Sequence, residues 1–270
     1  MTEIIKKRRY KILKLNIETT NICNAKCIMC PCKDMTRPKG IIKEALLKKI
    51  LTELPDDVRE VCLSLFGEPL IDNHIVLIME TTKELLNPSA KLMFFTNGSL
   101  LGEWVNKSIY KYLDEIIISF QGYDKESYQK NTMLNFLTSH NAIQHFLKDI
   151  PIRLKASVVM LDMGHTSEQK NKFRALFGKY GKISPARNWD TFQTDVDGTK
   201  IQCGRPQSLN VLWDGRVVLC CRDFDATVVL GNLNKNTVHE VWDSPKYKAI
   251  RQSFAQGKKT EEICKLCHPV

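Results

Sequence analysis

The 270-residue sequence has no apolar run approaching the roughly 18–20 residues that a membrane-spanning helix needs. Residues 1–11 are polar and basic, and no apolar core follows them, so we find no secretory signal. A basic stretch interleaved with aromatic residues, a nucleic-acid-binding motif, an internal repeat and a low-complexity segment are also absent. These absences predict a cytoplasmic protein that binds neither membranes nor nucleic acid.

Acidic residues are scarce relative to basic ones. The chain has 30 Asp and Glu against 40 Lys and Arg, which gives a formal net charge of +10. Such a surplus attracts anionic substrates or an acidic protein partner, and part of it can offset the negative charge of metal-bound thiolates. Hydrophobic residues make up 43% of the chain, enough for the core of one large domain with a small appendix.

Cysteine, in contrast, is abundant. The ten cysteines stand at positions 23, 27, 30, 32, 62, 203, 220, 221, 264 and 267. Clustered cysteines in a reducing compartment more often bind metal than form disulfides. Their concentration near the two ends of the chain predicts two separate metal sites. Cys62 lies alone within a strand-like run and is expected in the core.

The hydrophobic pattern predicts an α/β fold. Strands are expected at 12–18, 61–66, 92–95, 116–120, 152–160 and near Ile183, and helices at 42–54, 73–86, 103–113, 124–148 (with a break) and 167–177. This alternation indicates parallel βαβ units, which right-handed crossovers roll into a barrel or an open α/β sheet. In such folds the chemistry lies at the carboxyl ends of the strands.

A small module is expected after the barrel. Segments 209–213 and 216–219 flank Asp214-Gly215, which is typical of a hairpin turn. A helix is expected over 238–254, with Thr237 as its N-cap. We therefore divide the chain into a barrel domain at 1–190 and a C-terminal domain at 191–270.

The first cysteine group has the spacing Cys23-x3-Cys27-x2-Cys30 and follows the first strand. Three thiolates can hold three irons of a [4Fe–4S] cube and leave one iron open for an amine and a carboxylate. The alternative is a zinc site with Cys32 as the fourth ligand. Without zinc, Cys32 is expected to be a spare thiol.

This triplet, together with polar segments at the expected strand ends, resembles the radical S-adenosylmethionine (SAM) superfamily over residues 10–190. The segments are Phe66-Gly67-Glu68-Pro69, Thr96-Asn97-Gly98 and Ser119-Phe120-Gln121-Gly122; the family usually has glycine in place of Phe66. The resemblance implies a partial (β/α)6 TIM-like barrel whose [4Fe–4S] cluster binds SAM. Reductive cleavage of SAM then yields a 5′-deoxyadenosyl radical that takes hydrogen from a substrate. The cofactor-binding residues implied are Met29, Gly67, Glu68, Asn97, Ser119, Gln121 and Val159.

The second group, Cys203-x11-Gly215-x4-Cys220 followed by Cys264-x2-Cys267, resembles the twitch form of the SPASM domain. A hairpin plus a helix would carry it. The resemblance implies one auxiliary [4Fe–4S] cluster, because the chain ends three residues after Cys267. With four cysteine ligands the cluster has no open iron, so electron transfer is its expected role. The glycine spacing selects Cys220 over Cys221, and a structural zinc site is the alternative.

Arg187 is the expected catalytic residue, because the segment Arg187-Asn188-Trp189 lies between the barrel and Cys203, over the expected cavity mouth. It can bind a substrate anion or hydroxyl, or support deprotonation of a radical; the alternative is a surface arginine. Asp162 and His165 are further polar candidates. The layout most resembles enzymes of the 2-deoxy-scyllo-inosamine dehydrogenase type. That likeness implies oxidation of a secondary alcohol on a small molecule: a sugar, an aminocyclitol or a nucleotide-linked sugar.

Other functions are also consistent with these residues. Epimerisation or elimination would also start from the radical, with Cys32 or Cys221 as a hydrogen donor. Peptide or protein modification is disfavoured, because the first strand begins near Ile12 and leaves no room for a leader-binding domain. A non-catalytic zinc or iron–sulfur module is the alternative from another class. The basic charge favours an acidic flavodoxin or ferredoxin as reductant.

Overall fold

The computed structural model describes residues 11–185 and 205–265. Its strands are β1 Lys14–Ile17, β2 Glu60–Cys62, β3 Lys91–Thr96, β4 Glu115–Ser119, β5 Lys155–Asp162, β6 Gly181–Pro185, β7 Ser208–Val211, β8 Arg216–Val218 and β9 Val229–Asn232. Its α-helices are α1 Glu44–Thr52, α2 Ile75–Leu85, α3 Glu103–Tyr112, α4 Lys125–Thr132, α5 Phe136–Lys148, α6 Ser167–Phe177, α7 Val238–Trp242, α8 Pro245–Ala255 and α9 Glu262–Lys265. Short 3-10 turns are η1 Pro31–Lys33, η2 Pro69–Ile71, η3 Gly178–Tyr180 and η4 Arg205–Gln207.

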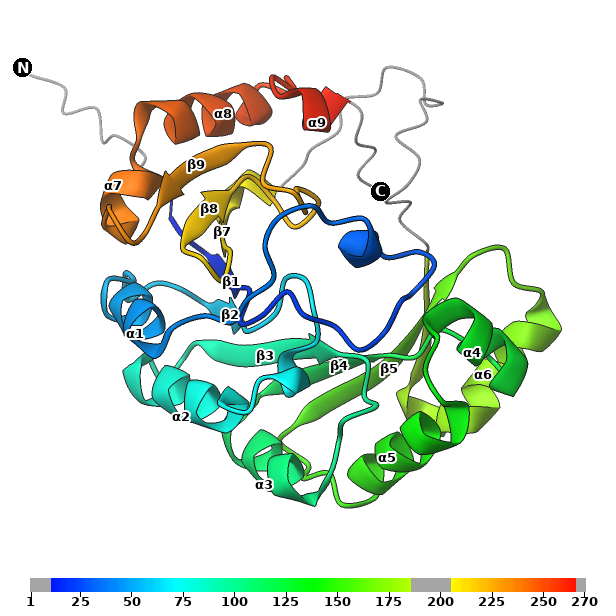
Figure 1. The fold of residues 1–270 in the computed structure, drawn as a ribbon. Coiled ribbons are helices and arrows are strands. Elements are labelled where there is room, and N and C mark those ends of the chain that lie inside the picture. The colour runs from blue at the N-terminus through cyan, green and yellow to red at the C-terminus, as the bar shows by residue number, and fades with distance from the viewer. Residues whose placement is uncertain (1–10, 186–204, 266–270) are drawn as a thin grey trace, which may run out of the picture.

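The first six strands form the predicted parallel sheet. The strand order is β6-β5-β4-β3-β2-β1-β7-β8-β9, and each neighbouring pair from β1 to β6 is parallel. The sheet curves into a partial barrel, with α1, α2, α3 and α5 along its convex side (Figure 1). The predicted break in 124–148 is present, because α4 ends at Met133 in a left-handed conformation (φ 60°). The α/β partial barrel is therefore confirmed.

Alternation along the strands separates a core face from an inner face. Leu15, Phe94 and Ile118 are fully buried and belong to the hydrophobic core cluster. The next residue of β3, Phe95, is 42% exposed, and Ser119 at the end of β4 is half-buried. The inner face is thus left open at the carboxyl ends of the strands, where ligands can bind.

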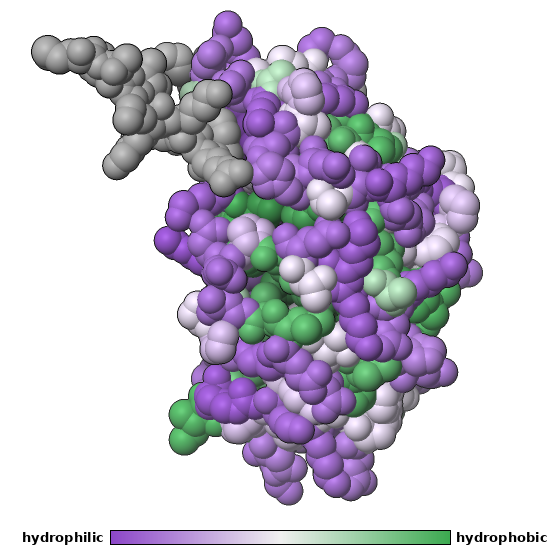
Figure 2. Space-filling model, turned by 90° about the vertical axis from the view of Figure 1, so that its left-hand side faces the viewer, coloured by the Kyte–Doolittle hydropathy of each residue, from purple (hydrophilic) through white to green (hydrophobic). Residues whose placement is uncertain are grey.

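The outer surface is mostly polar. From the side that lies on the left in Figure 1, the surface is mostly hydrophilic, with apolar patches set between polar side chains (Figure 2). Between α1 and α2 a cavity of about 340 Å³ has apolar lining that includes Ile42, Leu47 and Ile78. Among the described residues, no helix is both long and apolar enough to cross a membrane.

The C-terminal strands continue the barrel sheet. β7 pairs with β1 in parallel over four residues, while β8 and β9 add in antiparallel fashion. The predicted hairpin is present, and Gly215 takes the positive φ of 85° that its turn requires. β9 was not predicted, because its short run ends at Gly231-Asn232 and lacks strand alternation.

The single helix predicted over 238–254 is wrong. α7 ends at Trp242, and α8 begins at Pro245 with Ser244 as its N-cap. Proline has no N–H to continue a helix but fits its first turn, so this residue separates two helices. The predicted Thr237 cap is confirmed, since its side chain accepts from the Glu240 N–H within a capping box.

Candidate active site

The cysteine loop follows β1 and is held by the end of α4. The backbone N–H groups of Lys26 and Ile28 donate to the carbonyl oxygens of Thr132 and Asn131, both at 2.9 Å. The last carbonyls of a helix lack partners within the helix. These free acceptors therefore fix the loop that carries Cys27, next to the inner face of the sheet (Figure 1).

Cys23, Cys27 and Cys30 are half-buried in this loop. Burial raises the pKa of Cys23 to about 11 and that of Cys27 to about 12, since a buried thiolate loses its hydration. Bound iron reverses this preference, because a coordinating thiol is deprotonated outright. Three thiols that are costly to ionise alone are therefore suited to a cationic ligand.

The three thiols are the predicted ligands of an iron–sulfur cube. Among the described residues, no three His, Cys, Asp or Glu side chains are grouped closely enough to hold one metal ion. In a cube each cysteine binds its own iron, so the sulfurs stay further apart than around zinc. The assignment of Cys23, Cys27 and Cys30 to such a cube stays a prediction.

Cys32 lies beside the triplet. Its thiol shares a hydrogen bond with Cys30, which lowers the pKa of Cys32 to about 7 and raises that of Cys30. The Gly67 N–H also donates to the Cys32 sulfur. The predicted spare thiol is thus packed between the cysteine loop and the segment at the end of β2.

Gly67 brings this second segment against the cysteine loop. Its φ is +75°, and a Cβ at this position would lie 2.4 Å from the Thr20 carbonyl oxygen and 2.8 Å from that of Ile22. The next residue, Glu68, donates its N–H to the same Ile22 oxygen at 2.8 Å. Only glycine permits this approach, so the two segments form one wall of the site.

Both carboxylate oxygens of Glu68 form hydrogen bonds within the chain. Its Oε1 accepts from the Thr96 hydroxyl at 2.7 Å and from the Leu70 N–H at 3.1 Å, and its Oε2 accepts from the Asn97 N–H at 2.6 Å. Burial raises the pKa of Glu68 to about 7 despite these donors. The carboxyl group therefore ties the segment after β2 to the end of β3.

Asn97 joins the end of β3 to the cysteine loop. Its Nδ2 donates to Asn24 Oδ1 at 2.8 Å, and its side chain also hydrogen-bonds the Cys23 sulfur. Asn24 in turn donates to the Ser99 hydroxyl at 2.9 Å. This predicted cofactor residue therefore lies beside Cys23 and Asn24 of the cysteine loop.

Ser119 and Val159 are side by side on β4 and β5, where they are register partners. The Ser119 hydroxyl has no hydrogen-bond partner among the described residues, so it can bind a ligand. Gln121 differs, because its Oε1 accepts from the Leu161 N–H at 2.9 Å and its Nε2 donates to the Val159 carbonyl at 3.4 Å. Its amide bridges the two strands. Met29 is half-buried in the cysteine loop.

Lys182 is a residue that sequence reasoning missed. It pairs with Val159 in register, so it stands on the same face of the sheet as Ser119. It is exposed and forms no hydrogen bond or ion pair with any described residue. Two strand spacings put it about 10 Å from Ser119 along the row. The position of Lys182 follows from the register of β4, β5 and β6. The short apolar run near Ile183 predicted a strand but not its register.

The second cysteine group is described only in part. Cys220 and Cys264 are buried, each 8% exposed, whereas Cys221 is half-buried. The Arg222 N–H points at the Cys220 sulfur at 3.4 Å. The ligand set and the choice of Cys220 over Cys221 stay predictions. Arg187, Asn188, Trp189, Cys203 and Cys267 lie outside the described residues.

Two further polar candidates have local roles. Asp162 accepts from the His165 N–H at 3.0 Å and forms a 2.6 Å ion pair with Lys170. The His165 ring packs edge-on against Tyr123. These contacts give Asp162 and His165 the turn and surface roles that polar residues at loop starts commonly have.

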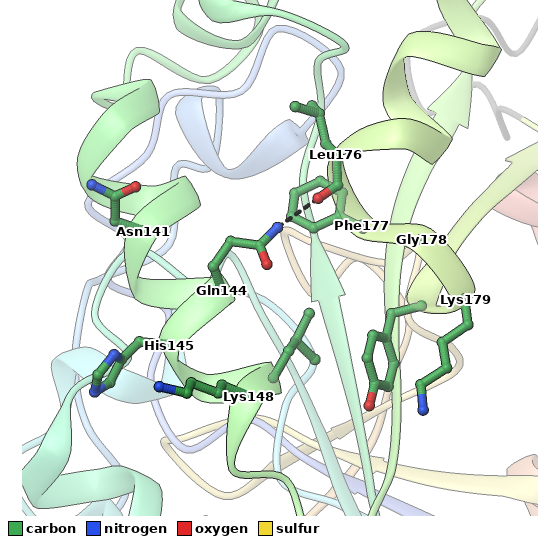
Figure 3. Close-up of a pocket in the computed structure, with 10 residues that line it drawn as sticks. Asn141, Gln144, His145, Lys148, Leu176, Phe177, Gly178 and Lys179 are labelled. Atoms are coloured by element: carbon green, nitrogen blue, oxygen red, sulfur yellow. Dashed lines mark hydrogen bonds between the residues drawn. The ribbon is translucent and has the colours of Figure 1, made fainter.

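A surface cavity of about 690 Å³ lies between α5 and the turn that follows α6 (Figure 3). Gln144 reaches across it to the Leu176 carbonyl at 2.5 Å, and Lys148 and Lys179 lie on opposite sides. Lys148 ends α5 and Lys179 precedes β6. The cavity is therefore at the amino ends of the strands, at the opposite edge of the sheet from the cysteine loop.

The chain belongs to the radical SAM superfamily. Residues 17–163 match the profile described as the radical SAM superfamily, and residues 202–268 match the SPASM iron–sulfur cluster-binding domain. The predicted class, a radical SAM enzyme with an iron–sulfur-binding C-terminal domain, is confirmed. The alternative of a non-catalytic metal-binding module is thereby excluded.

Among individual proteins, the chain is similar to the S-adenosyl-L-methionine-dependent 2-deoxy-scyllo-inosamine dehydrogenase of Niallia circulans. The two are 23% identical over 265 residues, which cover 95% of this chain and 92% of the relative. A probable GTP 3′,8-cyclase of Methanothermobacter thermautotrophicus is 30% identical over 127 residues, covering 47% of this chain and 41% of the relative.

Solved structures show the same fold. The crystal structure of BtrN in complex with AdoMet and 2-DOIA aligns with a TM-score of 0.68 and 18% identity, covering 96% of this chain and 94% of that one. The structure of anSMEcpe with bound AdoMet aligns with a TM-score of 0.71 and 17% identity, covering 94% and 82%.

Proposed function

We propose that this enzyme oxidises a secondary alcohol of a small polar molecule to a ketone, the substrate being a sugar, an aminocyclitol or a nucleotide-linked sugar. The observation that supports this reaction most directly is the extent of the similarity to the Niallia circulans dehydrogenase. It includes the C-terminal domain as well as the barrel, at 95% and 92% coverage. A likeness limited to the barrel would support SAM cleavage alone.

The proposed oxidation removes one hydrogen atom, one proton and one electron from the substrate, and each of them has an acceptor. The bound cluster and SAM supply the one-electron chemistry that forms the 5′-deoxyadenosyl radical. In such an oxidation the substrate carbon would give its hydrogen atom to this radical and the hydroxyl group would give up its proton, and a cluster held by Cys203, Cys220, Cys264 and Cys267 would accept the remaining electron. The products are 5′-deoxyadenosine and a ketone. We propose the basic chain surface as the docking site of an acidic flavodoxin or ferredoxin that supplies the first electron.

The residues assigned to this chemistry fall into three groups. Three cysteines would hold the SAM-binding [4Fe–4S] cluster: Cys23, Cys27 and Cys30. Four would hold an auxiliary [4Fe–4S] cluster: Cys203, Cys220, Cys264 and Cys267. The residues proposed to bind SAM are Met29, the Gly67-Glu68 backbone, Asn97, Ser119, Gln121 and Val159. Arg187 is proposed to bind the substrate hydroxyl.

Lys182 favours an anionic substituent on the substrate. It extends the row of Ser119 and Val159 away from the cysteine loop, and no described residue neutralises it. An ammonium with no acidic neighbour among the described residues favours binding of a phosphate or carboxylate. Of the three substrate types, a nucleotide-linked sugar fits this charge best.

The test is an anaerobic assay of the iron-reconstituted enzyme with SAM, dithionite and each substrate type. Oxidation predicts equal amounts of 5′-deoxyadenosine and ketone, and deuterium from the substrate carbon should appear in 5′-deoxyadenosine. Recovery of substrate carrying solvent deuterium at that carbon would instead indicate epimerisation. Formation of 5′-deoxyadenosine without ketone from any of the three substrate types would contradict the proposal.

A further inference from the structure

A buried ion pair joins Glu18 to Arg37. The guanidinium binds the carboxylate with both prongs, Nη1 to Oε2 at 2.8 Å and Nη2 to Oε1. The side chains are 0% and 3% exposed. Burial raises the pKa of Glu18, and Arg37 opposes that shift. Removing two charges from water costs several kcal/mol per ion, so such a pair requires further hydrogen bonds.

Those further hydrogen bonds come from the C-terminal part of the chain. Arg37 Nε donates to the Phe224 carbonyl at 2.5 Å. Asp225 Oδ1 accepts from the Arg37 N–H at 3.4 Å and from the preceding N–H at 2.8 Å. The Trp213 N–H donates to Glu18 Oε2 at 3.2 Å. The pair is therefore completed only when the C-terminal strands are in place.

The same pair lies between the segment that carries Cys23, Cys27 and Cys30 and the turn after Cys220. Glu18 directly follows β1 and leads into the cysteine loop, while Arg37 is on the segment that leaves Cys30. Phe224 is on the turn after β8, where the Cys220 carbonyl accepts from the Asp223 N–H at 3.1 Å. Arg37 also lies over the ring of Phe66, 5.5 Å from the ring centroid. Phe66 directly precedes Gly67. One guanidinium thus contacts Glu18 before the cysteine loop, Phe66 before Gly67, and the turn that follows Cys220.

We propose that the Glu18–Arg37 pair fixes the distance between the SAM site and the auxiliary cluster, and thereby the efficiency with which the substrate radical loses its electron. This inference rests on the proposed function. Electron transfer falls steeply with distance, so a small displacement of the Cys220 turn slows it. Glu18 and Arg37 act as positioning residues, since no hydrogen bond among the described residues joins either of them to a cysteine sulfur.

The experiment compares three variants with wild-type holoenzyme. Glu18→Gln combined with Arg37→Met removes both charges, a change that is often nearly neutral for stability, whereas Arg37→Met alone leaves a buried carboxylate unpaired. Lys83→Met is the matched control, because it breaks the 2.8 Å ion pair with Asp114 on the barrel far from both cysteine groups in sequence. Iron content and thermal unfolding report whether each variant folds and holds its clusters.

Two readouts then test positioning. Electron paramagnetic resonance of the fully reduced protein measures the spin–spin interaction between the clusters, and this readout needs no substrate. The ratio of ketone to 5′-deoxyadenosine measures how often the radical is oxidised. The double variant should keep its iron, show a weaker spin–spin interaction and lose several-fold in the product ratio, while Lys83→Met should change neither.

An unchanged spin–spin interaction in the iron-replete double variant would overturn the proposal. If the double variant does not fold, the same comparison is made with Arg37→Lys, which keeps the charge but loses the two-pronged contact and the Nε donor to Phe224. If wild type forms no ketone, the proposed oxidation fails, and the spectroscopic comparison still decides whether the pair sets the spacing.

Discussion

Replacing Gly67 by alanine should displace the cysteine loop. The new Cβ would meet three backbone atoms, the carbonyl oxygens of Thr20 and Ile22 and the Cα of Asn21, at 2.4–2.8 Å. Backbone atoms cannot move aside by changing rotamer. The left-handed conformation adds about 1–2 kcal/mol and the overpacking about 1–3 kcal/mol, so the free energy of unfolding should fall by about 2–5 kcal/mol.

Gly164 provides the matched control. Its φ of +88° is also left-handed, but a Cβ there meets nothing within 4 Å. Gly164→Ala should therefore cost only the conformational part, about 1–2 kcal/mol, and leave the cysteine loop in place.

The assay combines thermal unfolding of the iron-free chains with iron and sulfide analysis after anaerobic reconstitution. At about 2–4 °C per kcal/mol for a chain of this size, Gly67→Ala should melt clearly below Gly164→Ala. It should also lose the iron of the N-terminal cluster. Equal melting temperatures and full iron in both variants would refute the reasoning that the close approach at Gly67 shapes the site.

Three further predictions concern the site. Cys27→Ala should abolish 5′-deoxyadenosine formation yet keep about half of the iron, as measured by product and iron analysis, because the two proposed clusters have separate ligands; complete loss of iron would contradict two independent sites. The pKa of Glu68 is about 7 in the folded chain against 4.5 ordinarily, so the folded chain keeps a proton that the unfolded chain releases between these values. The contribution of Glu68 to the free energy of unfolding should fall by about 3 kcal/mol as pH rises from 4.5 to 8. Denaturant unfolding measures this contribution as the difference in free energy of unfolding between wild type and Glu68→Gln at each pH. A difference that does not change with pH would exclude the raised pKa. Lys182→Met should raise the KM for an anionic substrate roughly 10–100-fold, equivalent to about 1.5–3 kcal/mol for a lost charged hydrogen bond, with little change in SAM affinity. Lys179, whose ammonium lies over the Tyr180 ring, provides the control, and Lys179→Met should leave that KM unaltered.

The sequence predicted the parts of the molecule that depend on local patterns. The alternation of strands and helices predicted parallel βαβ units, because parallel neighbours require crossovers. The cysteine spacing placed Cys23, Cys27 and Cys30 in one loop after β1. Gly215 predicted the hairpin turn, since few other residues take its positive φ.

Features that depend on distant contacts could not be predicted. Arg37 meets Phe224, 187 positions later, and nothing near either residue indicates the partner. The hydrogen bonds of Glu68 with Thr96 and Asn97 likewise could not be predicted, because they depend on how β2 and β3 lie side by side. Lys182 acquires its position only from the register of three strands. The helix break at Pro245 was visible in the sequence, but the apolar spacing on both sides of it hid the interruption.

The pairing of β7 with β1 makes the C-terminal domain a structural part of the barrel. β1 carries the cysteine loop and has β2 on one side and β7 on the other. A protein truncated before β7 would expose the backbone N–H and C=O groups along one whole side of β1. Unpaired strand edges recruit other strands, so such a fragment should aggregate rather than fold as an autonomous SAM-cleaving unit.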